Sequence, residues 1–274
     1  MKSRKPKSPP KKNSSLGRLY FIYDQYSKHY IVDEPEEYVR PISGYVEFII
    51  GDGHDNEHEG KRERRTIAGR FEASYINVDN SLVAGVKLYG LMETYSAENA
   101  EVYETLFDPR TDILRKDVKE LLGDVTFRNI LVINRVGILP TYRGMGIGLA
   151  AIWDIIQHHS AGCGIVALKA FPYQFRSGSR SGRLSFLEES DWNKKMGYDP
   201  HIYTMEFAHE KLIFHLMKFG FKRIGDAGVV ALSTSMQNPI PQEIQRWFPR
   251  SVLPKPEKLL GCSAPLAGEE YSAS

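Results

Sequence analysis

Residues 130–153 constrain the fold of this chain more than any other segment. They begin with a β-branched apolar run, stop at Pro140, turn through glycines and continue at once with an apolar helical pattern. This order predicts a strand, a tight loop and a helix. Gly144, Gly146 and Gly148 allow the loop to turn tightly and to point successive backbone N–H groups toward one place. Because these groups coincide with a helix N-terminus, we expect the loop to bind an anion such as a phosphate.

One nucleotide-binding pattern fits part of this loop. Gly146, Gly148 and Ala151 match the loose G-x-G-x-x-G/A pattern of dinucleotide-binding proteins. That pattern expects an acidic residue about 20 positions further on, where it holds a ribose. The next predicted strand, residues 164–170, ends without a carboxylate, and the chain has no G-x-x-x-x-G-K-[S/T] sequence. An NAD(P)-binding enzyme is therefore a weaker alternative. A further alternative is that the glycines serve only to make a tight turn.

A second pattern in the loop is more specific. Arg143, Gly146 and Gly148 form R-x-x-G-x-G, and residues 138–148 resemble the corresponding segment of the GNAT superfamily of acyl-CoA-dependent N-acyltransferases. In that family the loop wraps the pyrophosphate of coenzyme A, and the preceding strand is splayed so that its backbone groups bind the pantetheine arm. The resemblance implies cofactor-binding roles on the strand for Val136, Gly137 and Ile138, and in the loop and following helix for Arg143, Gly144, Met145, Gly146, Ile147, Gly148 and Leu149.

The segment 207–223 carries a further resemblance, to the family's late helix and the Gly-Phe turn that follows it. With the glycine loop, the resemblance covers about residues 129–233. A tyrosine that often protonates the CoA thiolate in the family corresponds to Leu216, which cannot donate a proton. An asparagine that often contacts the cofactor corresponds to His209. Tyr203, just before the helix, could supply a phenol instead.

The activity implied by the resemblance is transfer of an acyl group, most simply acetyl, from acyl-CoA to a primary amine of a small molecule or peptide. No metal is implied. The reaction needs a deprotonated amine and stabilisation of the carbonyl oxygen, and backbone N–H groups can supply the latter. Glu93, at the end of a predicted strand, is the first candidate for a general base, followed by His209. Leu216 and the lack of a strand carboxylate leave a non-catalytic acyl-CoA-binding module as the alternative.

Composition restricts the partners of the chain. The net charge of +2 makes no general case for nucleic acid, and no apolar run is long enough to span a membrane. The basic N-terminus lacks the apolar stretch of a secretory signal. Cys163 and Cys262 are the two cysteines of the chain, which favours a reducing, cytoplasmic location. The sequence indicates no oligomeric state.

The predicted fold class is α/β of the α+β kind, with a mixed, twisted GNAT-type sheet flanked by helices on both faces. Residues 1–17 form a predicted disordered basic tail, 18–236 the GNAT-like domain with an insertion at about 172–203, and 237–274 a Pro-rich C-terminal tail. Trp247 and Phe248 could anchor that tail. Predicted strands cover residues 18–23, 44–50, 66–78, 82–92, 130–138, 165–171, 221–224 and 229–233, and predicted helices 97–107, 112–122, 148–158 and the late helix after 207.

Overall fold

A computed structural model places the greater part of the chain. It describes residues 18–24, 35–50, 64–172, 192, 194–196, 204–235 and 242–248. The predicted tail at residues 1–17, most of the predicted insertion, including Tyr203, and most of the 237–274 segment lie outside these ranges.

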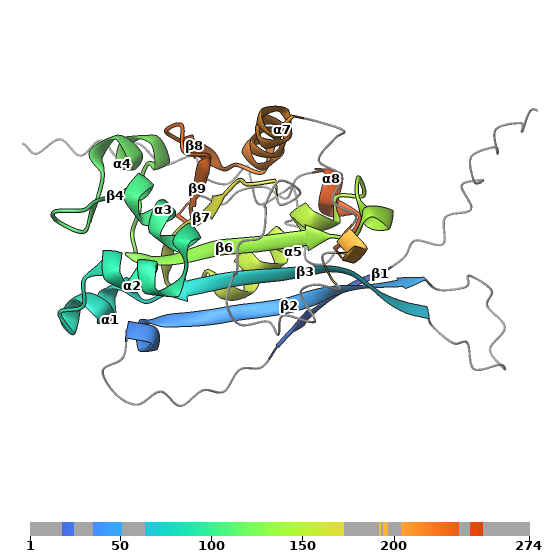
Figure 1. Cartoon of the computed structure of the whole chain (residues 1–274), viewed down its shortest axis with the longest axis horizontal. Helices are drawn as coiled ribbons and strands as arrows, with labels where there is room; N and C mark the ends of the chain where they lie inside the picture. Colours follow the sequence, from blue (N-terminus) through green and yellow to red (C-terminus); the bar gives the residue numbers. More distant parts are fainter. Residues whose placement is uncertain are drawn as a thin grey trace, which may run out of the picture.

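A seven-stranded sheet in the order β1-β2-β3-β6-β7-β9-β8 forms the centre of the molecule (Figure 1). Neighbouring strands are antiparallel except β6 and β7, which run parallel and are joined by the crossover helix α5. The sheet is therefore mixed and mostly antiparallel. Its strands are β1 (Arg18–Tyr23), β2 (Val39–Ile50), β3 (Arg64–Ile76), β6 (Asn129–Ile138), β7 (Cys163–Lys169), β8 (Lys222–Ile224) and β9 (Val229–Ser233).

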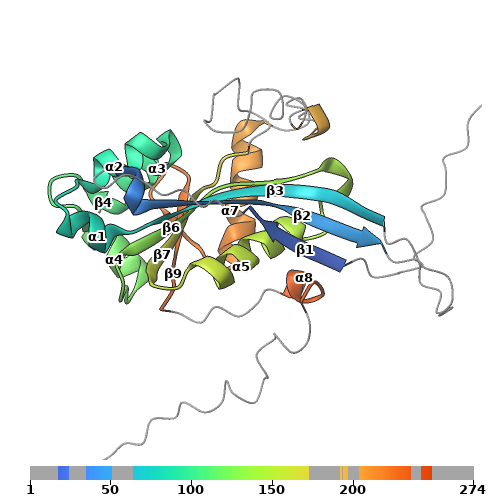
Figure 2. The same ribbon diagram turned by 90° about the horizontal axis from the view of Figure 1, so that it is seen from below.

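Helices cover both faces of this sheet, as the turned view shows for α2 and α3 on one side and α5 and α8 on the other (Figure 2). The first face carries α1 (Val78–Val83), α2 (Leu88–Tyr95), α3 (Ala97–Leu106) and α4 (Lys116–Leu122). The second carries α5 (Ile147–His159), α7 (Met205–Lys218) and α8 (Gln242–Gln245). Two 3-10 turns, η1 (Pro35–Tyr38) and η2 (Pro140–Tyr142), and the short pair β4 (Phe107–Asp108) and β5 (Ile113–Leu114) complete the described elements.

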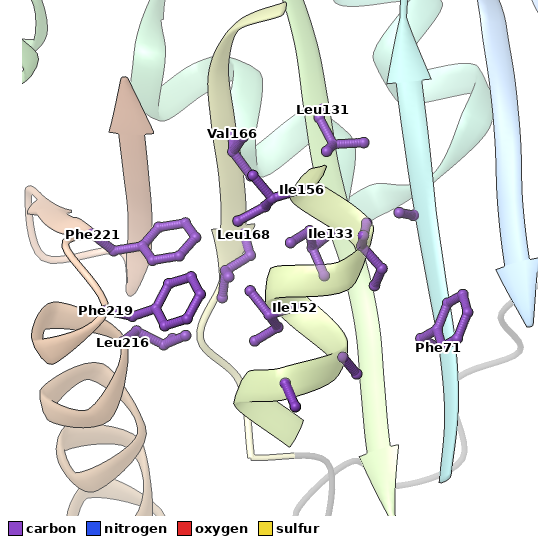
Figure 3. Packing of buried hydrophobic residues seen from close by; sticks show 14 of the residues in the cluster. Phe71, Leu131, Ile133, Ile152, Ile156, Val166, Leu168, Leu216, Phe219 and Phe221 are labelled. Atoms are coloured by element: carbon purple, nitrogen blue, oxygen red, sulfur yellow. The ribbon is translucent and has the colours of Figure 1, made fainter. Parts of the chain in front are cut away.

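The core on the α5 face connects four elements around the end of β6. Figure 3 shows Ile152 of α5, Ile133 of β6, Leu168 of β7 and Leu216 of α7 gathered in this core. Ile147, Ala150, Ala151 and Ile155 of α5 are buried, which matches the i, i+3, i+4 and i+8 spacing of one helical face. The helix after the glycine loop is thus held against the sheet by its own apolar pattern.

Most predicted elements are confirmed within a few residues, but the strand predicted at 82–92 is wrong. This segment forms the end of α1 and most of α2. The Asn77 side chain accepts a hydrogen bond from the backbone N–H of Asn80 and caps α1. Leu88, Leu91 and Met92 bury one face of α2 at helical spacing. Apolar residues were therefore dense enough to suggest a buried strand although their spacing is helical.

The helix predicted at 112–122 begins later than expected. Its first residue is Lys116, and its N-cap is Arg115. Asp112 has a positive φ of 54°, and its carboxylate accepts a hydrogen bond from the Tyr103 hydroxyl. The helix predicted at 97–107 is confirmed, and its N-cap is Ser96, whose hydroxyl accepts a hydrogen bond from the backbone N–H of Asn99 at 3.1 Å.

Gly164, at the start of β7, lies very close to the backbone of the segment just before β6. It is the additional residue on β7 between the pairs Asn129–Cys163 and Ile130–Ile165. A Cβ at this position would collide with the Phe127 backbone, with its carbonyl carbon at 2.8 Å, and with Val125 Cγ1 at 2.7 Å. Only glycine fits here without a backbone shift.

We therefore expect Gly164→Ala to lower the free energy of unfolding by at least about 2 kcal/mol, as overpacking against backbone does. Urea denaturation followed by circular dichroism measures the change. The matched control is Gly90→Ala in α2, where a Cβ meets no atom within 4 Å, so that this variant should be as stable as the unsubstituted chain or slightly more stable. An unchanged midpoint for Gly164→Ala would contradict the close packing.

Candidate functional site

The parallel strands β6 and β7 separate toward their C-terminal ends. Their ladder covers only Asn129–Val132 of β6, whereas β6 continues to Ile138 in register with β3 alone. β7 continues to Lys169 in register with β9. A β-bulge lies where the strands part, because Asn134 is an additional residue on β6 between the pairs that Glu72 and Ala73 make. Bulges bend the strand that carries them and are frequent beside functional sites.

A cavity of about 400 Å³ lies beside the separated strands on the α5 face. This volume is within the range of small-molecule sites, about 300–1,000 Å³. Most of its wall is apolar, and several of the side chains that line it are labelled in Figure 3. The apolar lining includes Ile133, Val136 and Ile138 of β6, Ile152 of α5, Leu168 of β7, Leu212 and Leu216 of α7, and Phe219, which directly follows α7.

The glycine loop and the first turn of α5 form one end of this cavity. Gly144 and Gly146 have φ values of 74° and 75°, which favour glycine, and Gly146 is the N-cap of α5. Gly146 has no side chain with which to cap the helix, and the first turn contains no acidic residue. The backbone N–H groups of that turn and the positive end of the helix dipole therefore favour an anion at the cavity. From this stretch Arg143, Gly144, Gly146, Ile147, Gly148 and Leu149 line the cavity.

Gly148 is a glycine that the packing of the protein does not require. Its φ is not positive, and the nearest atom to an added methyl group would be Ile138 Cγ1, at an ordinary contact distance of 3.5 Å. Alanine would usually be preferred at a helical position. A bare backbone at this point therefore leaves space on the cavity side that a ligand could occupy.

Two of the predicted cofactor-binding residues, Gly137 and Met145, do not line the cavity. Gly137 does not line the cavity, and a Cβ there would face Met196 and Trp192. Met145 packs its side chain against the core, and its carbonyl accepts a hydrogen bond from Trp247 Nε1 at 2.9 Å. The remaining residues of the prediction come together around the cavity.

Arg143 braces the loop through backbone carbonyls. Its Nε donates to the Ile138 carbonyl at 2.9 Å, and its Nη2 donates to the Met196 carbonyl at 2.8 Å. These bonds link the loop to the end of β6 and to a short helical piece at 194–196. Its guanidinium is therefore committed in part to holding the loop, which the sequence pattern alone did not indicate.

The three predicted catalytic candidates are not brought together at the cavity. Glu93 lies in α2 rather than at a strand end, is exposed, and its charge raises the pKa of the neighbouring Tyr89. The His209 ring packs against Gly228, where a side chain would collide with it. Neither residue lines the cavity, and Tyr203 lies outside the described residues.

α7 contributes His215 and Lys218 to the cavity wall instead. His215 directly precedes Leu216, and both border the cavity although they are about 100° apart around the helix. The sequence analysis named Leu216 and His209 on this helix and did not include His215 among the candidate residues. Its residue type, directly beside the position that corresponds to the family's tyrosine, was the available signal.

Polar side chains gather on the opposite face of the sheet, where β6 and β7 part. Asn134 Nδ2 donates to Asn99 Oδ1 at 2.6 Å, and Ser74 donates to Asn134 Oδ1 at 2.7 Å. Asn99 and Ser74 are fully buried, and Asn99 Nδ2 has no hydrogen-bond partner within the described parts of the chain. Lys169, the last residue of β7, forms an ion pair with Glu101 of α3. Because Asn134 and Lys169 also border the cavity, this polar side of the opening adjoins its apolar wall.

Comparison of the chain with protein-family models, with curated proteins and with solved structures gave no match. Among the residues that the structure describes, no helix is both long and apolar enough to cross a membrane. Within the same residues, no group of three or more His, Cys, Asp or Glu side chains is arranged to hold a metal ion. The geometry of the cavity is therefore the basis on which a function can be assigned.

A second cleft lies at the other end of α5, between His159, Arg40 and Tyr75. Burial, with smaller effects from the positive charges of Arg40 and His158, lowers the pKa of His159 to about 4. The Tyr23 ring packs edge-on against His159, and its hydroxyl donates to Asp154 at 2.6 Å. Burial also raises the pKa of Asp154. His159 is thus held in its neutral form over most of the acidic range.

We expect the neutral His159 to make the fold sensitive to acid between about pH 6.5 and pH 4. In that window the unfolded chain binds more protons at this residue than the folded chain, so stability falls as the pH falls. Urea midpoints at several pH values measure the effect, with His159→Asn as the comparison. The difference in urea midpoint between the unsubstituted chain and His159→Asn should shrink as the pH is lowered, because only His159 takes up a proton on unfolding in this range. Parallel pH profiles would contradict the assignment.

Proposed function

We propose that the protein is an acyl-CoA-dependent N-acyltransferase of the GNAT type, which transfers an acyl group, most simply acetyl, to a primary amine. One observation carries the proposal. A strand that has parted from its parallel neighbour, a glycine loop and an uncapped helix N-terminus all border a single cavity of about 400 Å³. The GNAT resemblance of the sequence assigns the same three features to the pantetheine arm and the pyrophosphate of coenzyme A.

The shape and polarity of the cavity suit the two parts of the cofactor. The apolar wall formed by Val136, Ile138 and Leu212 would contact the pantetheine arm, whose backbone-like amides can bond to the edge of β6. The N–H groups of the first turn of α5 would bind the pyrophosphate. Gly148 would then be bare because the cofactor passes over it, which gives the glycine a function that packing does not.

The acceptor amine would approach from the polar side of the opening. There Asn134, which also borders the cavity, donates a hydrogen bond to Asn99 at the bulge. Backbone N–H groups of β6 would stabilise the oxygen of the thioester carbonyl as charge develops on it. Holding amine and thioester together supplies a large share of the rate acceleration. His215, in the cavity wall, is our candidate for returning a proton to the departing thiolate.

Calorimetric titration with acetyl-CoA, with NADPH as the control ligand, tests the cofactor. We expect saturable binding of acetyl-CoA and no binding of NADPH. The loop suits a pyrophosphate, and the cavity beside it suits the pantetheine arm, which NADPH lacks. Binding of NADPH alone would replace the proposal with a dinucleotide-binding site. Thiol release measured with a panel of primary amines then separates an enzyme from a non-catalytic acyl-CoA-binding protein, since the latter binds the cofactor but releases no thiol with any amine. If thiol is released, a lower kcat at unchanged KM in His215→Gln assigns the proton transfer to that residue.

Gly148→Ala tests where the cofactor lies. An added methyl group fits the protein, so the variant should unfold at the same or a higher urea concentration than the unsubstituted chain. It should nevertheless bind acetyl-CoA about tenfold more weakly, because the methyl group occupies space beside the pyrophosphate.

Gly90→Ala is the matched control, since it adds the same group to a helix that does not border the cavity. It should leave the acetyl-CoA affinity unchanged. Equal affinities for Gly148→Ala and Gly90→Ala would show that the pyrophosphate does not pass over the first turn of α5.

A further inference from the structure

A segment near the end of the chain, residues 242–248, returns to the glycine loop. It starts with α8, whose Ile244 is fully buried in the core on the α5 face. Trp247 then packs edge-on against Phe48 of β2, with ring centroids 6.1 Å apart, and Phe248 packs edge-on against Trp153 of α5 at 6.5 Å. Figure 2 shows α8 on the same side of the sheet as α5. Apolar contacts therefore fix the position of this segment.

The segment places two hydrogen-bond donors on one carbonyl of the glycine loop. The Met145 carbonyl accepts from Trp247 Nε1 at 2.9 Å and also from Arg246 Nη2. The guanidinium of Arg246 lies over the Trp247 ring, 4.8 Å from its centroid. A carbonyl oxygen has two lone pairs, so both lone pairs of the Met145 carbonyl are occupied. The two donors are 101 and 102 residues away from Met145 in the sequence.

These two bonds determine the direction of the next N–H group. Met145 and Gly146 share a trans peptide, in which the C=O and the N–H point to opposite sides of the chain. Gly146 lines the cavity, whereas Arg246 and Trp247 do not. With its carbonyl held on the side of Arg246 and Trp247, this peptide directs the Gly146 N–H away from them, and Gly146 itself borders the cavity.

We propose that Trp247 and Arg246 are positioning residues of the acyl-CoA site, which hold the Met145–Gly146 peptide so that its N–H faces the phosphate. The inference rests on the proposed function. A glycine on the C-terminal side of this peptide offers little resistance to rotation of the peptide plane. Rotation would turn the negative end of the carbonyl dipole toward the phosphate, and the two donors oppose it.

The assignment gives the 242–248 segment a role in ligand binding that goes beyond attachment to the domain. Arg143 holds the loop from one side through the carbonyls of Ile138 and Met196. Trp247 and Arg246 hold it from the other. The loop is therefore fixed before the ligand arrives, and preorganisation of this kind raises affinity because less ordering is needed on binding.

Trp247→Phe tests the inference, because it removes the indole N–H and retains an aromatic ring beside Phe48. The matched control is Trp153→Phe, whose indole N–H has no hydrogen-bond partner within the described residues. Two ligands are titrated into the full chain: acetyl-CoA, and S-acetylpantetheine, which lacks all phosphates. We expect Trp247→Phe to bind acetyl-CoA about threefold more weakly and Trp247→Phe with Arg246→Gln about tenfold more weakly, while both bind S-acetylpantetheine as the unsubstituted chain does.

A general loss of structure would weaken both ligands alike, and that outcome would overturn the positioning role. Unchanged acetyl-CoA affinity in the double variant, with the unsubstituted chain binding normally, would also overturn it and leave the proposed function in place. Absence of acetyl-CoA binding by the unsubstituted chain would instead remove the proposed function itself. Amide hydrogen exchange without ligand gives an independent measurement: exchange at residues 144–147 should be faster in Trp247→Phe than in Trp153→Phe.

Discussion

The early end of the ladder between β6 and β7 is the constraint on which the rest of the site depends. These strands form the one parallel pair among the described strands of the sheet, and a parallel pair joined by a crossover helix places both C-terminal ends and the N-terminus of that helix at the same edge. Once the ladder ends at Val132, the edge of β6, the opening beside it and the first turn of α5 must face a common space. The bulge at Asn134 bends β6 at this point and gives the opening its second, polar side.

The apolar core on the α5 face also forms part of the cavity. Ile152 of α5 and Phe219, which directly follows α7, belong to this core and line the cavity as well. Fully burying such a side chain contributes about 1.5–3 kcal/mol, so these contacts fix α5 and α7 on the sheet. Their less buried neighbours, Leu149 and Leu212, continue the cavity wall. Helix position and apolar lining are thus consequences of the same packing.

The sequence predicted the features of the site that depend on near neighbours. The β-branched run, the break at Pro140 and the glycine spacing specify the strand, loop and helix locally, and the structure confirms these elements. The prediction that placed Glu93 at a strand end was wrong, because a dense apolar segment can satisfy either a buried strand or a helix. The contact of Trp247 with Met145 could not be predicted, since it joins residues 102 apart in sequence and depends on the complete tertiary fold. Neither could the bracing role of Arg143, because the donors of an arginine can bind either a phosphate or carbonyl oxygens.

The bracing contacts also explain how a loop so rich in glycine can provide a defined binding surface. Glycine gives the loop the positive φ values that direct its N–H groups, but the same freedom favours other conformations when no ligand is present. Here the carbonyl before the loop, at Ile138, and the carbonyl within it, at Met145, are both held by donors from arginine or tryptophan side chains. The donors bind carbonyl oxygens and leave the N–H groups of the helix terminus available. Holding the acceptors of a loop while its donors remain open is the arrangement that an anion-binding site requires, and it needs the strand, the 194–196 segment and the 242–248 segment to be in place together.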